Sequence, residues 1–135
     1  MNQKNMAAKP NPGEMKILIA DDQLAMRELL KTILRTLRIS NMDVVGDGMQ
    51  AVERYRQTRH DMVFLDIDMP ELDGFSALSQ IKAIEPTVFV VMVSAHSSVE
   101  NVKKALELGA RGFVVKPYTS IKIADMLKKY REATA

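Results

Sequence analysis

The sequence predicts an α/β fold, a doubly wound parallel sheet with helices on both faces. Three observations lead to this prediction. Short apolar runs alternate with segments of helical periodicity along most of the 135-residue chain. The runs are apolar throughout, which is typical of parallel strands buried on both faces. Four of them end on a polar or charged residue, as expected where the carboxyl ends of strands line one crevice.

Five strands are expected from these runs. KILIA leads into Asp21 and Asp22, and MVFL leads into Asp66. VFVVMV leads into Ser94, and GFVV leads into Lys116. MDVVG adds a short second strand in the order of the chain. The expected strands are therefore residues 16–20, 42–46, 62–65, 88–93 and 112–115.

The helices are expected between these strands. The first follows Asp22, because apolar side chains recur there at the i, i+3, i+4, i+7 spacing of an amphipathic helix. Its apolar positions are Met26, Leu29, Leu30, Ile33, Leu34 and Leu37. The second helix is expected at residues 48–58 and the third at about 75–84, after the loop 68–74.

Hydroxyl side chains mark the starts of the last two helices. Ser97 and Ser98 offer N-caps to a fourth helix that runs through Leu108 and stops at Gly109. The fifth helix is capped by Thr119 or Ser120 and reaches about residue 131.

Five strands alternating with five helices indicate a single flavodoxin-like (βα)5 domain. Right-handed crossovers favour a doubly wound sheet. The strand order 2-1-3-4-5 fits, because its switch point lies beside the first strand. The expected organisation is a flexible N-terminal lead-in at residues 1–14, a domain at 15–131 and a C-terminal tail at 132–135.

Composition and charge narrow the class of protein. The chain has no cysteine, so disulfides and thiolate metal sites are excluded. Its net charge of +2 is weak for a nucleic-acid-binding domain. No apolar stretch precedes Met15, so no signal peptide or membrane span is expected. A cytoplasmic protein with no nucleic-acid or membrane partner is the expectation.

Three aspartates are expected to meet at the crevice. Asp21, Asp22 and Asp66 would repel one another by about 4 kcal/mol for a pair at 4 Å with an effective dielectric near 20. Mg²⁺ is the natural counter-charge, since it takes one or two carboxylates and also binds phosphate oxygens. The alternative is that Asp21 or Asp22 caps the first helix.

A hydroxyl and an ammonium complete the expected site. Ser94 and Lys116 can hold the additional oxygens of a phosphoryl group as charge develops on it. Asp66 is then the candidate nucleophile, because a carboxylate can accept a phosphoryl group and form an acyl phosphate. Each residue alone is an ordinary strand-end side chain, and only their coincidence at four strand ends indicates a reaction site.

Two segments carry a resemblance to a known family. LDIDMPELDG contains an aspartate, two residues, Met-Pro and then Asp-Gly, and GARGFVVKPY contains a Lys-Pro pair. With DD after the first strand and VSAH after the fourth, the chain resembles two-component response-regulator receiver domains, of the stand-alone chemotaxis type. The resemblance covers about residues 15–131.

The resemblance implies roles for single residues. Asp66 would be the phosphoacceptor, and Asp21, Asp22 and Asp66 with the backbone carbonyl of Asp68 would bind Mg²⁺. Ser94 would be the switch hydroxyl and Lys116 the cationic contact of the phosphoryl group. Phe113 would be the aromatic switch residue, although a strand phenylalanine is usually a core residue.

A further hypothesis concerns Asp68 and His96, which are expected to flank the entry to the site. Asp68 lies two residues after Asp66, and His96 lies two residues after Ser94. An Asp68–His96 pair would control the access of water and so set the rate of dephosphorylation. The alternative is that both are solvated loop residues.

The expected function is that of a single-domain response regulator, not an enzyme. The phosphoryl donor would be a histidine kinase or a histidine phosphotransfer protein. The output would be a protein bound at the face made by the fourth helix, fifth strand and fifth helix. That face carries Lys103, Lys104, Lys122 and Lys128.

Three rival functions stay open from sequence. Asp66-Ile67-Asp68 resembles the acid pair of haloacid-dehalogenase-like phosphatases, but that pair should follow the first strand and precede a threonine. The chain could be the receiver part of a DNA-binding transcriptional regulator. It could also be a degenerate receiver that acts only as a scaffold, although the acidic, hydroxyl and lysine positions are all filled.

Overall fold

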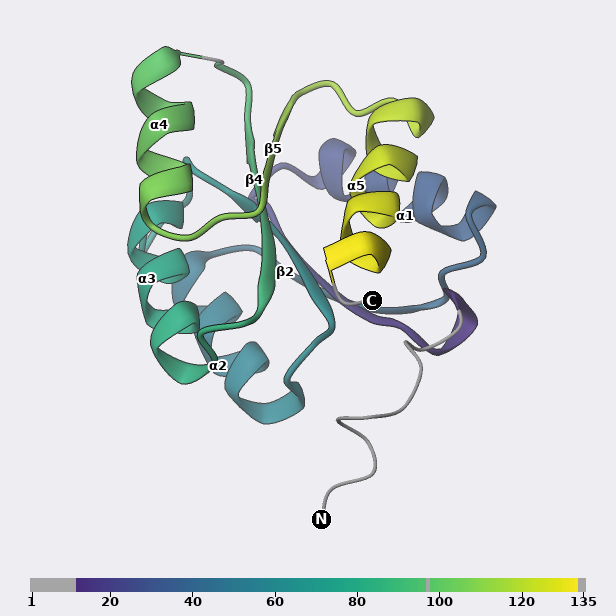
Figure 1. The fold of residues 1–135 in the computed structure, drawn as a ribbon, viewed down its shortest axis with the longest axis horizontal. Helices are drawn as coiled ribbons and strands as arrows, with labels where there is room; N and C mark the ends of the chain where they lie inside the picture. The colour runs from purple at the N-terminus through teal and green to yellow at the C-terminus, as the bar shows by residue number, and fades with distance from the viewer. Residues whose placement is uncertain (1–11, 97, 134–135) are drawn as a thin grey trace.

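A five-stranded parallel sheet forms the centre of the molecule (Figure 1). The computed structural model describes residues 12–96 and 98–133. The strand order is β2-β1-β3-β4-β5, which confirms the predicted order. In register, Leu18 of β1 pairs with Val63 of β3, and Val93 of β4 pairs with Val114 of β5. All strands therefore end at one edge of the sheet.

The observed strands agree closely with the apolar runs. They are β1 Lys16–Ala20, β2 Asn41–Val45, β3 Met62–Asp66, β4 Phe89–Ser94 and β5 Gly112–Val115. β1 and β5 have the predicted bounds. β2 begins and ends one residue earlier than predicted, and β3 and β4 include the polar residue on which their runs end.

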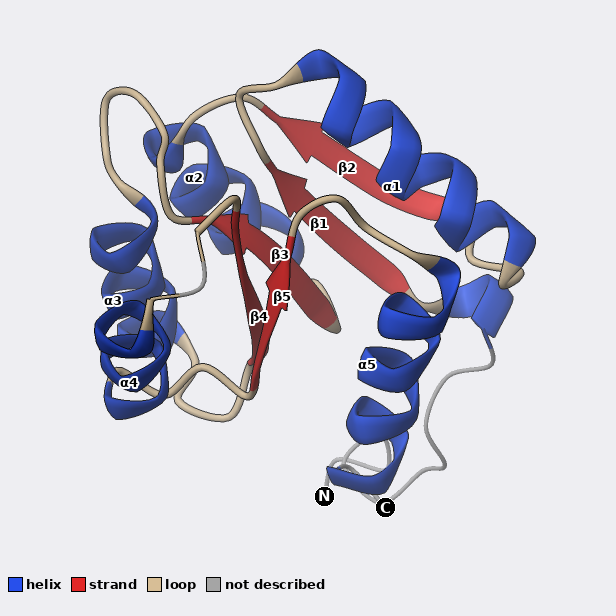
Figure 2. Cartoon of the chain, turned by 90° about the horizontal axis from the view of Figure 1, so that it is seen from above, coloured by secondary structure: helices blue, strands red, loops and turns tan. Residues whose placement is uncertain are grey.

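Helices cover both faces of the sheet. The helices are α1 Leu24–Thr36, α2 Gly48–Thr58, α3 Gly74–Ile84, α4 Val99–Glu107 and α5 Ser120–Ala133. α1 and α5 lie on one face, and α2, α3 and α4 lie on the other (Figure 2). Every residue of β3 and β4 is buried, because these strands have neighbours on both sides and helices above and below. This explains why their sequences are apolar without alternation.

Two apolar layers hold the helices to the sheet. One contains Ile19, Leu34 and Ile123 between the sheet and the α1–α5 pair. The other contains Leu18, Leu65 and Leu78 between the sheet and the remaining helices. Adjacent strand residues point to opposite faces, so Leu18 and Ile19 enter different layers.

Side-chain caps start four of the helices. Ser98 and Thr119 accept backbone N–H groups of α4 and α5, so both predicted caps are present. Asp47 and Asp73 cap α2 and α3 in the same way. Gly109 has φ +98°, which ends the α4 segment as predicted.

The ends of the domain differ slightly from the predicted division. A short 3-10 helix, Pro12–Glu14, lies within the predicted lead-in, and residues 1–11 lie outside the described residues. α5 continues to Ala133, two residues into the predicted tail. Ser97, the alternative cap of α4, also lies outside the described residues. No helix in the described ranges is both long and apolar enough to cross a membrane.

Candidate functional site

The carboxyl edge of the sheet gathers the predicted site residues. Asp66 is the last residue of β3 and Ser94 the last of β4. Asp21 directly follows β1, and Lys116 directly follows β5. Asp21, Asp66 and Ser94 are buried. The four strand ends therefore place two carboxylates, a hydroxyl and an ammonium within one region.

Lys116 is the centre of the hydrogen-bond network. Its Nζ lies 2.9 Å from Oδ2 of Asp21 and donates a hydrogen bond of 2.8 Å to Oδ2 of Asp66. The Lys116 side chain is only 7% exposed, so these ion pairs are shielded from solvent. A buried pair of like charges is tolerable here because the ammonium lies between the two carboxylates.

Burial and charge shift the ionisation of this cluster in opposite directions. Burial, with Asp21 nearby, raises the pKa of Asp66 to about 6, although Lys116 acts to lower it. Burial alone would lower the pKa of Lys116, but its hydrogen bonds to Asp21 and Asp66 outweigh this and raise that pKa. Lys116 is therefore a permanent cation beside a carboxylate that resists ionisation.

The three aspartates fit a divalent cation. Asp21, Asp22 and Asp66 each offer a carboxylate oxygen, and these oxygens lie within 4.8 Å of one another. Oδ2 of Asp21 is buried and accepts no well-formed hydrogen bond, although Nζ of Lys116 is 2.9 Å away. A buried carboxylate oxygen with spare acceptor capacity is suited to a hard cation such as Mg²⁺.

Helix capping does not explain the two adjacent aspartates. Gln23 occupies the N-cap position of α1 and makes no side-chain capping bond. Oδ1 of Asp21 instead accepts the backbone N–H of Gln23 at 2.8 Å, which fixes the carboxylate at the end of β1. Asp22 is exposed at the edge of the site.

Ser94 joins the ends of β4 and β5. Its hydroxyl accepts the backbone N–H of His96 at 2.9 Å. Its carbonyl accepts the backbone N–H of Lys116 at 2.8 Å. The Ser94 hydroxyl still has a proton to donate, so it can bind a second oxygen without losing its hold on the following loop.

Asp68 and His96 flank the site through their backbones. The backbone N–H of Asp68 donates to Oδ1 of Asp66 at 3.2 Å. The side chains of Asp68 and His96 are both exposed, and within the described ranges no ion pair joins them. Their proposed control of water stays a prediction.

Phe113 is partly exposed and packs against the apolar layer beneath α2, α3 and α4. The neighbouring Gly112 and Val114 are buried. Phe113 is thus neither fully buried, as a core residue would be, nor fully exposed, as in one position of an aromatic switch.

Gln23 is the site residue that the sequence analysis missed. Its Oε1 accepts a hydrogen bond of 2.8 Å from Nζ of Lys116. With Asp66 and Lys116 it lines a pocket of about 150 Å³, whose other lining residues are Asp22, Asp68 and Ala95. The only signal in the sequence was a polar residue directly after two acids.

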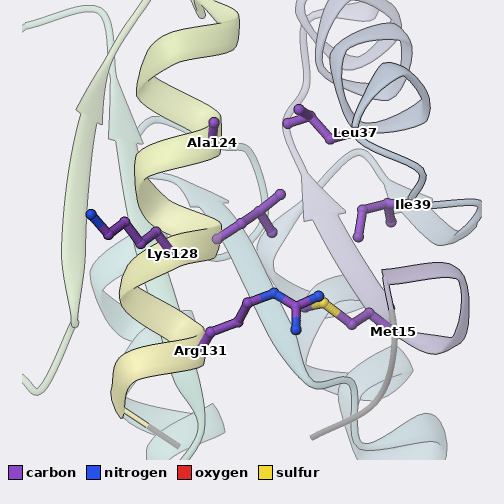
Figure 3. Close-up of a pocket in the computed structure, with 7 residues that line it drawn as sticks. Met15, Leu37, Ile39, Ala124, Lys128 and Arg131 are labelled. Carbon is purple, nitrogen blue, oxygen red and sulfur yellow. The ribbon is translucent and has the colours of Figure 1, made fainter. Parts of the chain in front are cut away.

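A second cleft lies between α1 and α5 (Figure 3). It has a volume of about 280 Å³ and lies at the amino ends of the strands, because Met15 and Ile39 directly line it. Its other lining residues are Leu37, Ala124, Leu127, Lys128 and Arg131. None of these side chains is an acid or a nucleophile, so this cleft is separate from the acidic site.

The chain matches one protein family over most of its length. Residues 17–128 match the family described as the response regulator receiver domain. The chain is 39% identical to the chemotaxis protein CheY of Listeria monocytogenes, over 85% of this chain and 97% of that protein. It is 37% identical to CheY of Bacillus subtilis, over 84% of this chain and 95% of that protein.

Solved structures share the fold. One is the CheX-CheY-BeF3-Mg+2 complex from Borrelia burgdorferi, with a TM-score of 0.80, 33% identity and coverage of 84% of this chain and 86% of that chain. Another is the receiver domain of the sensor histidine kinase PA1611 from Pseudomonas aeruginosa, with magnesium coordinated in the active site cleft. Its TM-score is 0.79 at 26% identity, with coverage of 87% of this chain and 98% of that chain.

Proposed function

The chain belongs to the response regulator receiver domain family, and from this premise we propose that Asp66 is the residue that accepts the phosphoryl group. Members of this family signal through phosphorylation of an aspartate in the presence of Mg²⁺. One observation carries the assignment to Asp66. Of the two buried carboxylates that Lys116 contacts, Asp21 and Asp66, only that of Asp66 lines the acidic pocket.

The phosphoryl transfer needs a donor whose phosphorus is open to in-line attack. An oxygen of Asp66 attacks the phosphorus of a phosphohistidine in a histidine kinase or histidine phosphotransfer protein. The bond from phosphorus to the imidazole nitrogen breaks, and that nitrogen keeps the electron pair and takes up a proton. The new bond is an acyl phosphate on Asp66.

Asp21, Asp22 and Asp66, with the backbone carbonyl of Asp68, would hold the Mg²⁺ ion. Bound Mg²⁺ supplies positive charge for the developing charge on the phosphoryl oxygens. Lys116 adds an ammonium that is held between Asp21 and Asp66. The ammonium is already fixed beside the carboxylate of Asp66, where it can stabilise charge that develops on the phosphoryl group.

The output surface is proposed at the β5 edge of the sheet, between α4 and α5. Three apolar side chains of α4 and α5 are strongly exposed: Val99 at 81%, Leu106 at 54% and Ile121 at 83%. Lys103 and Lys122 are exposed on the same two helices, and the amino group of Lys128 points away from the α1–α5 cleft (Figure 3). A partner with apolar and acidic side chains suits this surface.

Two of the rival functions receive less support. The acid pair of a haloacid-dehalogenase-like phosphatase would follow the first strand, whereas Asp66 ends β3. The chemotaxis relatives match over 97% and 95% of their own lengths, so the chain is similar to whole chemotaxis proteins, whose names describe no DNA-binding regulator. We propose that the chain acts as a phosphorylated switch and does not turn over an external substrate.

Mass spectrometry after incubation with acetyl phosphate and Mg²⁺ tests the assignment. We expect one phosphoryl group on the wild type and none on Asp66→Asn. Asp125→Asn is the matched control, because Asp125 is an exposed carboxylate paired with Lys129 on α5. Incorporation into Asp66→Asn at the wild-type level would refute the assignment. Absence of incorporation into the wild type would favour the scaffold alternative.

A further inference from the structure

Lys116 has a third acceptor that the phosphoryl-accepting reaction does not require. Besides Asp21 and Asp66, its Nζ donates to Oε1 of Gln23 at 2.8 Å. Gln23 comes from the loop after β1, while Lys116 comes from the end of β5. This contact therefore ties two strand ends together across the mouth of the pocket.

An ammonium has three N–H donors and no acceptor. Oxygen atoms of Asp21, Asp66 and Gln23 lie 2.9, 2.8 and 2.8 Å from Nζ, and those of Asp66 and Gln23 accept well-formed hydrogen bonds from it. A phosphoryl oxygen on Asp66 would be a fourth acceptor. It would compete with these three oxygens for the N–H groups and the space around Nζ.

Gln23 is the acceptor that can leave most readily. The side chains of Asp21 and Asp66 are 1% and 4% exposed and carry charge, so loss of the ammonium would leave buried carboxylates without a counter-charge. Gln23 is neutral and exposed, so water can replace its partner. The N–H of Lys116 that Gln23 accepts is thus the one that a phosphoryl oxygen can take over.

The backbone position of Gln23 supports a role beyond the helix. Gln23 is the N-cap residue of α1, where Ser, Thr, Asp or Asn would normally accept a backbone N–H. Its side chain makes no capping bond and turns toward Lys116 instead. A local rule broken in this way is expected at a functional site.

We infer that Gln23 is a placeholder for the phosphoryl group: it occupies the Lys116 donor in the unphosphorylated protein and must swing away when Asp66 is phosphorylated. Gln23 is then a positioning residue that sets the rate of phosphorylation through Lys116. This inference rests on the proposed role of Asp66. It adds that the Gln23 side chain competes with the phosphoryl group for Lys116.

Substitutions at Gln23 should speed phosphorylation when they weaken the bond to Lys116 and slow it when they strengthen that bond. Gln23→Ala removes the acceptor, and Gln23→Asn is one methylene shorter and can cap α1, which preserves the helix. Both should be phosphorylated by acetyl phosphate about threefold faster and bind beryllofluoride about threefold tighter, as loss of one exposed hydrogen bond implies. Gln23→Glu should hold Lys116 more firmly and react about tenfold more slowly.

Leu24→Glu is the matched control for added negative charge. Leu24 is the adjacent residue, is 63% exposed and does not line the pocket. The phosphorylation rate of Gln23→Glu is divided by that of Leu24→Glu. This ratio corrects for the repulsion of the anionic donor by any added negative charge. Mg²⁺ affinity, measured by calorimetry, should be unchanged in Gln23→Ala and Gln23→Asn, whereas a general loss of structure would lower it.

Two results would overturn the inference. One is slower phosphorylation or weaker beryllofluoride binding of both Gln23→Ala and Gln23→Asn, which would mean that Gln23 aligns Lys116 for the reaction. The other is a Gln23→Glu rate equal to that of Leu24→Glu. Failure of the wild type itself to accept phosphate would refute the role of Asp66 instead, so the two failures are distinguishable.

Discussion

Asp66 combines two properties that work against each other. It must be ionised to attack phosphorus or to bind a cation, yet burial near Asp21 raises its pKa to about 6. The lysine that stabilises its charge, Lys116, also pairs with Asp21. The site is therefore arranged for a cation and a phosphoryl group at the expense of the free protein's stability.

The raised pKa of Asp66 has a consequence for stability that depends on pH. The folded protein binds more protons than the unfolded chain between pH 3.8 and about 6, so its stability falls as pH rises through that window. Above pH 6 the ionised Asp66 costs about 3 kcal/mol by this linkage. Asp66→Asn should therefore stabilise the protein by about 1 to 3 kcal/mol at pH 7.5 without Mg²⁺.

Urea unfolding followed by circular dichroism at pH 7.5 and pH 3.8 tests this expectation. The stabilising effect of Asp66→Asn should shrink at the lower pH, where the carboxyl is almost fully protonated in the folded protein and about half protonated in the unfolded chain. EDTA keeps divalent cations away during both titrations. A variant that is less stable than the wild type at pH 7.5 would show that the Lys116–Asp66 pair is net stabilising.

At the scale of elements, the connection from β3 to α3 holds Asp66 in place. α3 begins at Gly74, whose backbone N–H donates to the carbonyl of Ile67 at 2.8 Å. A Cβ added at Gly74 would overlap the carbonyl of Asp66. The start of the helix is thus packed directly against the backbone of the phosphoacceptor residue, and only glycine fits there.

Gly74→Ala should disturb both stability and the site. We expect the free energy of unfolding to fall by about 1 to 3 kcal/mol, because overpacking forces the backbone to move. Phosphorylation by acetyl phosphate should slow as well, since Asp66 moves with its carbonyl. Gly13→Ala is the control, because its added Cβ would meet only the carbonyl of Arg38 at 4.0 Å. Equal stability of the two variants would contradict the packing argument.

The elements were largely predictable because the strongest local signals agree with the tertiary structure. KILIA and GFVV are buried runs with polar ends, and their bounds were predicted to the residue. β2 was placed one residue late, because this edge strand is only partly buried and its sequence is less distinctive. Side-chain caps carry their own signal: Ser98, one of the two predicted caps of α4, accepts the backbone N–H of Asn101.

The site was predictable as a set of residues but not as a set of contacts. Four strand ends had to meet once the parallel sheet was predicted, which brought Asp21, Asp66 and Lys116 together. The bond from Lys116 to Gln23 spans 93 positions and depends on the path of two long side chains, which no local pattern encodes. For the same reason the Asp68 and His96 side chains could not be oriented from sequence.

At the scale of the whole molecule, a signal has to travel from the carboxyl edge of the sheet to α4. Ser94 is the physical link, because its hydroxyl holds the backbone of His96 at the start of the β4–α4 connection. α4 is short, and Ala105 is its one fully buried residue. A helix with so little buried surface is free to shift when its preceding loop moves.

Phosphorylation adds a charge of about −1.5 to −2 beside Ser94. If the Ser94 hydroxyl donates to a phosphoryl oxygen, the β4–α4 connection and α4 should change together. Hydrogen exchange with and without beryllofluoride and Mg²⁺ measures this change. We expect altered exchange in residues 95–107 and little in α2, which packs on β1 and β2, at the edge of the sheet opposite β5.

Ser94→Ala separates the chemistry at Asp66 from its transmission to α4. The variant keeps Asp66 and Lys116, so it should still bind beryllofluoride with Mg²⁺. Without the hydroxyl, the exchange response of residues 95–107 should fall to less than about half of the wild-type response, because one charge-assisted hydrogen bond no longer pulls on the loop. A full response in Ser94→Ala would show that α4 is reached by another route, most directly through Lys116, whose backbone N–H binds the carbonyl of residue 94 whatever its side chain.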